Sequence, residues 1–324
     1  MGKLLKRNEF ILFCILLLFA CFVGFVNTGF WSPLNIFSLL KSSVVMGIFA
    51  IGTLMVILSG GIDISFPAFS VFSFYITVKY LVAIKYQGTI LLPFVLAVFI
   101  GMSLGLVNAF LISKFRLAPL IVTLGTGSAV TGFLRAFVGT GIIPNLPSSM
   151  VAFSRMNILN TTLPDGSIAS LSVSIFLFLG LAVGAAFFLK YTTLGRGIYA
   201  FGGDPVAALR VGFNPIKIQC FVYGMAGALA GAAGIVHSSL IRQANPRDLE
   251  GFEMEIIASV VLGGASLTGG KGTVLGTVLG VFILVLIKSS LILVGIPSDW
   301  QKVVVGAVLI TATVATAYRM KRHA

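Results

Sequence analysis

The sequence predicts an all-α, polytopic membrane protein. The chain has 324 residues, of which 58% are hydrophobic and 10% are charged, whereas a soluble domain carries about 25% charged residues. The mean hydropathy of +1.08 agrees with a chain that is largely solvated by lipid. Apolar runs recur without the period-2 alternation of a membrane barrel, so helices are expected throughout residues 1–324, as a single transmembrane domain.

About ten apolar segments are expected to cross the bilayer, because a span needs about 20 residues, or somewhat fewer when it is broken or tilted. The segments are 9–27, 43–59, 65–84, 89–113, 118–139, 170–189, 218–236, 254–268, 273–292 and 302–318. The runs at 43–59 and 254–268 are short for a span. Ten crossings with a cytoplasmic N-terminus also leave the C-terminus in the cytoplasm.

The net charge of +13 would first suggest a nucleic-acid partner. The placement of the charges argues against this. When the ten spans alternate from a cytoplasmic N-terminus, the majority of the lysines and arginines fall on the cytoplasmic side, which is the bias typical of integral membrane proteins. The basic excess therefore indicates orientation in the membrane, and no nucleic acid is predicted to bind.

Two connections are longer than simple turns. Residues 140–169 are rich in Pro, Asn and Ser, and the charge rule assigns them to the outside. Residues 190–217 carry four basic residues, which assigns them to the cytoplasm. The first is therefore expected to be an external loop and the second a cytoplasmic loop.

The cytoplasmic loop contains the pattern of a short, capped helix. Gly202-Gly203 interrupts the chain, Asp204 is a suitable N-cap, and Pro205 suits the first helical position. The stretch VAALRV can then form two helical turns before Gly212. This pattern is typical of a docking element on the inner face; the alternative is a structured loop that only joins two spans.

A glycine-rich stretch at 260–276, VVLGGASLTGGKGTVLG, could be taken for a phosphate-binding loop. That motif requires a glycine at 265 and a hydroxyl residue at 272, where this chain has Ala265 and Gly272. The flanks are membrane spans rather than a strand and a soluble helix. ATP binding by this chain is therefore excluded, and the stretch is interpreted as a glycine hinge with Lys271 on its cytoplasmic side.

The sequence offers no residue set for catalysis, and it predicts no cofactor and no metal. The histidines are His237, expected at an interface or in a loop, and His323, in the basic tail. No zinc-binding motif, paired-carboxylate cleft or Cys/His set is present. A membrane-embedded enzyme is thereby disfavoured, and the chain is expected to be a non-enzymatic subunit.

Four charged residues lie within or beside the spans: Asp63, Arg135, Glu253 and Glu255. An ionisable group at such a position is costly and suggests a function. Each also has a purely structural interpretation. Asp63 would cap the next helix, Arg135 would pair with a carboxylate or extend to the outer face, and the two glutamates would sit at a helix start.

Small residues and one short repetition complete the pattern. The stretches 226–234 and 272–280 place Gly and Ala at close helical spacing, which lets helix backbones approach one another. The segment VILSGGIDIS at 56–65 is similar to VVLGGASLTG at 260–269. Broken helices at matching positions are typical of transporters built from two related halves.

Three motifs together resemble one family. ILSGGIDIS at 57–65, YAFGGDPVAALRVGFNP at 199–215 and EMEIIASVVLGGASLTGGKGTVLG at 253–276 are similar to the membrane permease subunit of ribose/galactose-type ABC importers, and the resemblance covers nearly the whole chain. It implies a cobalamin-importer-like (type II) ABC permease fold in the bacterial cytoplasmic membrane. It also implies partners: cytoplasmic ABC ATPase subunits, an extracytoplasmic sugar-binding protein and a second permease subunit.

The resemblance also implies site residues. The expected ATPase-coupling residues are Gly202, Gly203, Asp204, Pro205, Ala207, Ala208, Arg210 and Gly212. The expected translocation path or gate comprises Ser59, Gly60, Gly61, Asp63, Ser65, Glu253, Glu255, Gly263, Gly264, Gly269 and Gly270. Where the family usually continues with Ser-Val-Gly, this chain has Ser65-Phe66-Pro67, which leaves the substrate open.

The predicted function is an ATP-driven import permease for a small hydrophilic solute, with ribose or galactose as the expected class. One alternative is an ABC permease for nucleosides or for a sugar-like signalling molecule. A second is a self-sufficient carrier or channel, although the scarcity of buried carboxylates disfavours coupling to an ion gradient.

Overall fold

A computed structural model describes residues 8–163, 166 and 168–293, together with scattered positions between 297 and 310. The predicted span 302–318 falls mostly outside the described residues, and both chain termini fall outside them as well. Within the described residues the chain is helical apart from one small hairpin and the connecting loops.

The elements follow one another in this order: α1 (Asn8–Val26), the 3₁₀ turn η1 (Thr28–Trp31), α2 (Pro33–Leu58), α3 (Phe66–Ala83), α4 (Leu91–Phe115), α5 (Pro119–Phe133), the π-helical turn η2 (Leu134–Val138), α6 (Ser148–Arg155), β1 (Asn157–Thr162), β2 (Ile168–Ser172), α7 (Ser174–Tyr191), α8 (Thr193–Gly203), α9 (Pro205–Arg210), α10 (Pro215–Ile241), α11 (Phe252–Leu262) and α12 (Val274–Leu293). Proline occupies the first helical position at several starts, where its fixed φ suits a helix and its missing N–H is not needed.

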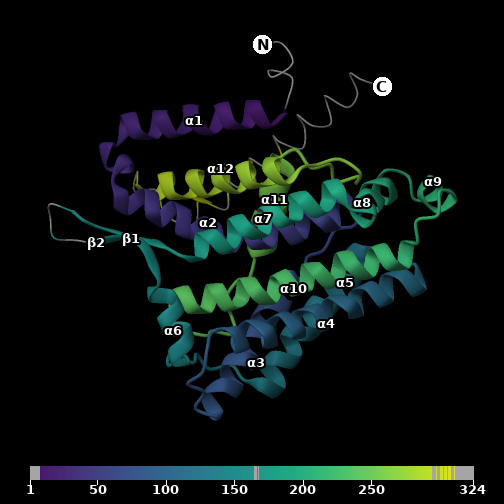
Figure 1. The fold of residues 1–324 in the computed structure, drawn as a ribbon, viewed down its shortest axis with the longest axis horizontal. Coiled ribbons are helices and arrows are strands. Elements are labelled where there is room, and N and C mark those ends of the chain that lie inside the picture. Colours follow the sequence, from purple (N-terminus) through teal and green to yellow (C-terminus); the bar gives the residue numbers. More distant parts are fainter. Residues whose placement is uncertain are drawn as a thin grey trace.

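The long helices run roughly side by side, so the molecule has two ends (Figure 1). One end carries α9 and is called the α9 end; the antiparallel hairpin β1–β2 projects from the opposite, hairpin end. At the hairpin end, a backbone bridge between Ile143 and Ala244 ties the long loop after η2 to the segment that follows α10.

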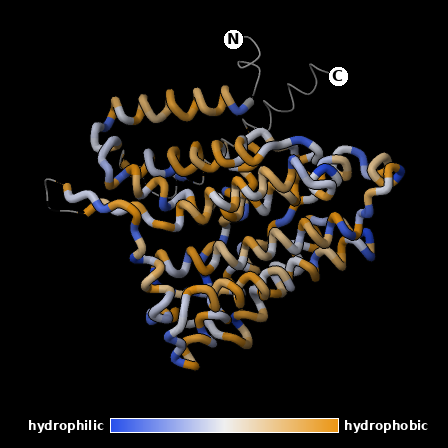
Figure 2. The backbone as a smooth tube through the Cα atoms, in the orientation of Figure 1, coloured by the Kyte–Doolittle hydropathy of each residue, from blue (hydrophilic) through white to orange (hydrophobic). Residues whose placement is uncertain are grey.

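Eight helices in the described part of the chain are long and apolar enough to cross a membrane: α1, α2, α3, α4, α5 continued by η2, α7, α10 and α12. Figure 2 shows hydrophobic residues along the lengths of these helices and hydrophilic residues gathered near their ends and connections. The prediction of a helical, multi-pass membrane protein is confirmed at this level.

Two of these helices form the centre of the bundle. Within their most apolar windows, 83% of the α2 residues and 72% of the α10 residues are buried, against 11% for α1 at the edge of the molecule. α10 packs closely on α4 because glycines leave the backbones bare: a Cβ on Gly227 would overlap the carbonyl group of Gly101. The predicted role of the 226–234 stretch in close helix packing is confirmed.

The predicted span at 254–268 is wrong as a continuous helix. α11 ends at Leu262 after 11 residues, a rise of about 16 Å against about 30 Å for the hydrocarbon core. The helix stops because Gly264 turns the chain with a φ of +92°. Hydropathy alone extends the span through this stop, since the residues that follow are small and apolar.

Three smaller differences from the expected elements concern the start of α2 and the secondary structure within the two long connections. α2 begins at Pro33, ten residues before the predicted span, because Ser32 caps it by accepting a hydrogen bond from the N–H of Asn35. The connection 140–169, which is expected to be external, contains α6 and β1 and leads into β2, so a small hairpin interrupts the all-α fold. The loop 190–217 contains α8 as well as the expected short helix, because Thr192 caps the N–H of Gly195.

Candidate functional site

The short helix α9 has the capped geometry that the sequence predicts. The Asp204 carboxylate accepts hydrogen bonds from the N–H groups of Val206 (2.9 Å) and Ala207 (3.0 Å), and Pro205 is the first helical residue. At the other end, Gly212 adopts a φ of +90°, where only glycine fits without strain. The predicted N-cap and glycine stop are confirmed as local structure.

The surface of α9 is apolar and open. Val206, Leu209 and Val211 are each more than half exposed, whereas Ala208 is buried beneath them. A hollow of about 870 Å³ lies between α9 and the neighbouring ends of α4, α5 and α10. An exposed apolar helix beside a hollow, on an end of the bundle rather than on its lipid-facing side, has the form of a protein-docking surface.

The expected coupling residues divide between this surface and its base. Gly202 and Ala208 are buried. The others lie on the exposed surface: Gly203, Asp204, Pro205, Ala207, Arg210 and Gly212. The helix therefore presents most of the expected residues outward and is anchored through the remaining two.

Glycines from three distant segments meet at the base of α9, in what we call the glycine contact: Gly60, Gly202, Gly269 and Gly270. The N–H of Gly270 donates to the carbonyl oxygen of Leu58 at 3.0 Å. A Cβ on Gly269 would lie 2.5 Å from the Gly202 oxygen and 2.8 Å from the Gly60 Cα. Here backbone touches backbone, with no intervening side chain.

The glycine contact joins the three sequence motifs in space. The loop after α2, the end of α8 and the loop after α11 each contribute a glycine. The loop after α11 is also held by Tyr199, whose hydroxyl donates to the carbonyl oxygen of Gly272 at 3.0 Å. Burial raises the pKa of the Tyr199 phenol, which keeps it a neutral donor. α9 is thus connected to the end of the central helix α2 through the last residues of α8.

A groove of about 440 Å³ lies nearer the hairpin end, between α3, α5 and the segment before α11. Hydroxyl groups of Thr123, Ser128 and Thr131 line its α5 side, and Ile64, Pro67 and Val71 supply an apolar face. Mixed hydroxyl and apolar walls suit a small polyhydroxylated molecule, which presents hydroxyl groups at its rim and C–H groups on its faces.

Charged residues surround the mouth of the groove. Arg135, Asp248, Glu250 and Glu253 all line it, and Arg135 forms an ion pair with Glu250. The expected pairing of Arg135 with a carboxylate is confirmed. This pair links the π-helical turn η2 to the segment before α11, and three acidic groups against one basic group make the mouth negative.

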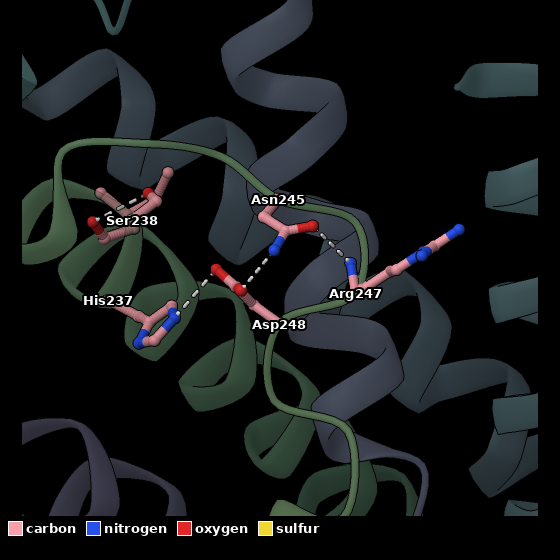
Figure 3. A network of polar contacts seen from close by, with 6 residues as sticks. His237, Ser238, Asn245, Arg247 and Asp248 are labelled. Carbon is pink, nitrogen blue, oxygen red and sulfur yellow. Dashed lines mark hydrogen bonds and ion pairs between the residues drawn. The ribbon is translucent and has the colours of Figure 1, made fainter. Parts of the chain in front are cut away.

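A polar network fixes the segment that carries this mouth. Figure 3 shows His237, near the end of α10, pointing toward Asp248, with Asn245 on the other side of the same carboxylate. The distances are 3.3 Å from His237 Nε2 to Asp248 Oδ2 and 2.9 Å from Asn245 Nδ2 to Asp248 Oδ1. The histidine lies within α10 rather than in a loop, and it orders the connection that follows this helix.

Some expected path residues lie near the groove. Glu253 lines it, whereas Asp63 and Ser65 are buried directly behind it. Asp63 is expected to cap the next helix, and its carboxylate accepts from Ser65 N (2.7 Å) and Ser65 Oγ (2.6 Å) just before α3 begins. The capping expectation is wrong: the N-cap of α3 is Ser65, which makes no side-chain capping bond, and Asp63 instead closes an Asx turn on Ser65 before the helix begins.

Other expected path residues are used for packing. Glu255 forms an ion pair with Lys288 of α12 at 2.8 Å, and a Cβ on Gly263 would lie 2.5 Å from the Gly276 oxygen. The Ser59 hydroxyl donates to the Val56 carbonyl oxygen of its own helix. Gly61, Gly264, Gly269 and Gly270 shape the two loops.

Several residues of the groove lie outside the expected path or gate. They are Thr123, Ser128, Thr131, Asp248 and Glu250, which all line the groove. The signal for the α5 residues was the run of hydroxyl residues and glycines in TLGTGSAVTG at 123–132, which places polar groups along a helix inside an apolar protein. Asp248 and Glu250 follow α10 in a connection whose packing no local pattern reveals.

The chain matches the family described as branched-chain amino acid transport system / permease component over residues 35–313. It is 34% identical to the ribose import permease protein RbsC of Bacillus subtilis (strain 168), over 96% of this chain and 92% of the relative. It is 31% identical to RbsC of Haemophilus influenzae (97% and 94%) and 31% identical to the autoinducer 2 import system permease protein LsrC of Yersinia enterocolitica (94% and 81%). No solved structure matches.

These findings agree with the fold. A match over most of the chain, together with near full-length relatives, confirms the resemblance to permease subunits that the three motifs predicted. The eight apolar helices confirm the expected multi-pass location in the cytoplasmic membrane. The chain therefore belongs to the family of branched-chain amino acid transport system / permease components.

Proposed function

We propose that this protein is the permease subunit of an ATP-driven ABC importer and forms the membrane path for a monosaccharide such as ribose. Relatives named as ribose import permeases, similar over nearly the whole chain, support the substrate class. The groove between α3 and α5 supports it independently, because its walls combine hydroxyl groups with an apolar face. ATP is hydrolysed by a partner.

The observation that carries the proposal is α9 and its attachment. An exposed apolar helix, capped by Asp204, sits on the glycine contact at the end of the central helix α2. In this proposal α9 is the coupling helix that receives the ATPase, and residues Gly202 to Gly212 transmit its movement. The α9 end then faces the cytoplasm, which agrees with the basic residues of the loop 190–217.

The rest of the assembly follows from this orientation. The hairpin end, with residues 140–169, faces outward and receives the sugar-binding protein. Both termini are cytoplasmic, the fold is of the cobalamin-importer type, and a second permease subunit completes the path. The groove, together with the loops 59–65 and 263–270, is the path or gate that alternates between the two sides.

A second candidate function concerns the substrate. One group of relatives is named for autoinducer 2 import, so a sugar-like signalling molecule is an alternative cargo for the same groove. A self-sufficient carrier is a different class, and it predicts uptake into vesicles that contain this polypeptide alone and are driven by an ion gradient.

The test of coupling is the substitution Ala207→Glu. Ala207 is exposed on α9, so a bulky acid there would obstruct an apolar docking surface without disturbing the core. We expect loss of ATP-dependent ribose uptake and loss of co-purification with the ATPase, while the protein still inserts. Thr193→Glu is the matched control, because it adds the same charge at an exposed helix start on the same end.

Normal uptake by the Ala207→Glu protein would overturn the coupling role of α9. Ion-driven uptake by the wild-type polypeptide alone would favour the carrier. Uptake of the signalling molecule in place of ribose would keep the importer and change its cargo.

A further inference from the structure

A chain of buried hydrogen bonds connects the loop after α2 with the helix that lines the groove. Ser65 Oγ donates to Asp63 Oδ1 at 2.6 Å and accepts from Asn108 Nδ2 of α4 at 2.9 Å. Asn108 Oδ1 in turn accepts from Thr126 Oγ1 of α5 at 2.7 Å. Three separate elements are therefore joined by side chains in one continuous series.

Three of the four members of the series are buried, and Thr126 is half-buried. Ser65 and Asn108 have no exposed surface, and Asp63 is 3% exposed. Hydrogen bonds in such an environment are stronger than in water, and a member that loses its partner pays a large desolvation cost. The positions of the loop and of the two helices are therefore linked.

The last member of the series has acceptors in its own helix besides Asn108. Thr126 Oγ1 also lies 3.0 Å from the carbonyl oxygen of Val122, one turn earlier in its own helix. A single hydroxyl proton forms a well-aligned hydrogen bond with one of these acceptors at a time. Thr126 can therefore release Asn108 and remain hydrogen-bonded, which gives the connection two discrete arrangements.

The α5 end of the series lies at the groove. Thr123 and Gly127, which flank Thr126, both line the groove. A Cβ on Gly127 would lie 3.3 Å from the Ser65 Cα, so the loop and this face of α5 are in direct contact. A shift of Ser65 therefore moves the groove wall.

The other end of the series, Asp63, belongs to the loop that begins at the glycine contact. Gly60, five residues before Ser65, packs on Gly202 at the base of α9. The hydrogen bond from Gly270 to Leu58 holds the last residue of α2, directly before this loop. The loop 59–65 thus touches the end of α8, directly before α9, at its start and the groove wall at its end.

We propose that Ser65, Asn108 and Thr126 are positioning residues that transmit displacement of α9 to the groove wall formed by α5. The proposal rests on the proposed function for its biological meaning. The mechanical coupling itself can be measured on this chain alone.

The experiment is a double-mutant cycle read out at the groove. Ser128, exposed on the α5 side, is replaced by cysteine in a protein whose Cys14, Cys21 and Cys220 are replaced by serine. The rate of Ser128→Cys labelling by a small charged methanethiosulfonate is measured in liposomes. Asp204→Ala, which removes the cap of α9, is then combined with Thr126→Val, which removes one hydroxyl at constant volume.

We expect Asp204→Ala to change the labelling rate about fivefold, the factor that corresponds to one hydrogen bond. In the Thr126→Val protein the same substitution should change the rate less than twofold. Thr126→Ser, which keeps the hydroxyl, should restore the full response, and Ser65→Ala should abolish it as Thr126→Val does.

Thr77→Val is the matched control. Thr77 is buried in the neighbouring α3, and its hydroxyl has no hydrogen-bond partner among the described residues. The Thr77→Val protein should therefore keep the full response to Asp204→Ala. A response that persists in Thr126→Val, or that is absent in every background, would overturn the relay.

A parallel measurement separates this proposal from the proposed function. In the reconstituted complex, Thr126→Val should reduce labelled ribose transported per ATP hydrolysed about fivefold. Absence of ATP-dependent ribose uptake in the wild type would overturn the proposed function, whereas the labelling cycle would still decide the relay.

Discussion

The helices α2 and α11 end in the same way and continue differently. At the end of α2, Gly60 has a φ of +82°, and Gly60 N and Gly61 N donate to Ile57 O (2.9 Å) and Val56 O (3.1 Å). At the end of α11, Gly264 has a φ of +92°, with the matching bonds at 2.9 and 3.2 Å. Both are Schellman caps, so the sequence similarity of 56–65 and 260–269 is confirmed as structure.

The difference lies in what supports each end. α2 has 26 residues and lies in the core, and its loop enters the buried side-chain network through Asp63 and Ser65. α11 has 11 residues and rests on α12, through the contact of Gly263 with Gly276 and the ion pair of Glu255 with Lys288. The shared cap therefore specifies where each helix stops. The residues after the cap specify which parts of the protein the loop contacts.

The largest effect is expected where the α2 end meets α8. A Cβ on Gly202 would overlap the carbonyl of Leu58 and lie 2.8 Å from the Gly270 nitrogen, whereas a Cβ on Gly203 meets nothing within 4 Å. Gly202→Ala should lower the free energy of unfolding by about 3 kcal/mol or more, because backbone atoms cannot repack. It should also abolish uptake. Gly203→Ala should stay within about 1 kcal/mol of the wild type. Folded yield, thermal midpoint and uptake test the pair, and equal behaviour would contradict the glycine contact.

A moderate effect is expected at the α2 cap itself. Gly60 has a positive φ, but a Cβ there would find its nearest neighbours at 3.6 Å. Gly60→Ala should therefore lower the free energy of unfolding only by the strain of a left-handed backbone, about 1–2 kcal/mol. Gly60→Asn should lower it less. Gly269→Ala should lower the thermal midpoint further, since strain and overlap with Gly202 combine there. A Gly269→Ala protein with the thermal midpoint of the wild type would contradict the overlap of Gly269 with Gly202.

The smallest effect is expected at Lys271, in the loop after α11. Its side chain is exposed, and the spacing around it fails as a phosphate loop. Lys271→Gln should change the free energy of unfolding by less than about 0.5 kcal/mol and leave uptake unchanged. Thermal melting and transport assays measure this. A large loss would assign the α11 loop a charge-dependent role that the α2 loop lacks.

Local chemistry made part of this structure predictable. The caps at Asp204 and Gly212 depend on residues within one turn, and the long spans depend on hydropathy, so the sequence indicates both. The stop of α11 at Gly264 was missed because an apolar run continues through it. The groove was missed because it forms where α3, α5 and the segment before α11 meet, and hydrogen bonds such as Asn108 to Ser65 join residues far apart in the chain.

The glycine contact and the groove mouth differ in how they respond to pH and to salt. It consists of uncharged backbone in close van der Waals contact, so neither protonation nor ionic strength weakens it. The groove mouth is held by the ion pair of Arg135 with Glu250, both partly exposed, and screening by salt weakens such pairs. Salt in the surroundings can therefore weaken the link between η2 and the segment before α11, while the connection of the α8 end to α2 stays constant.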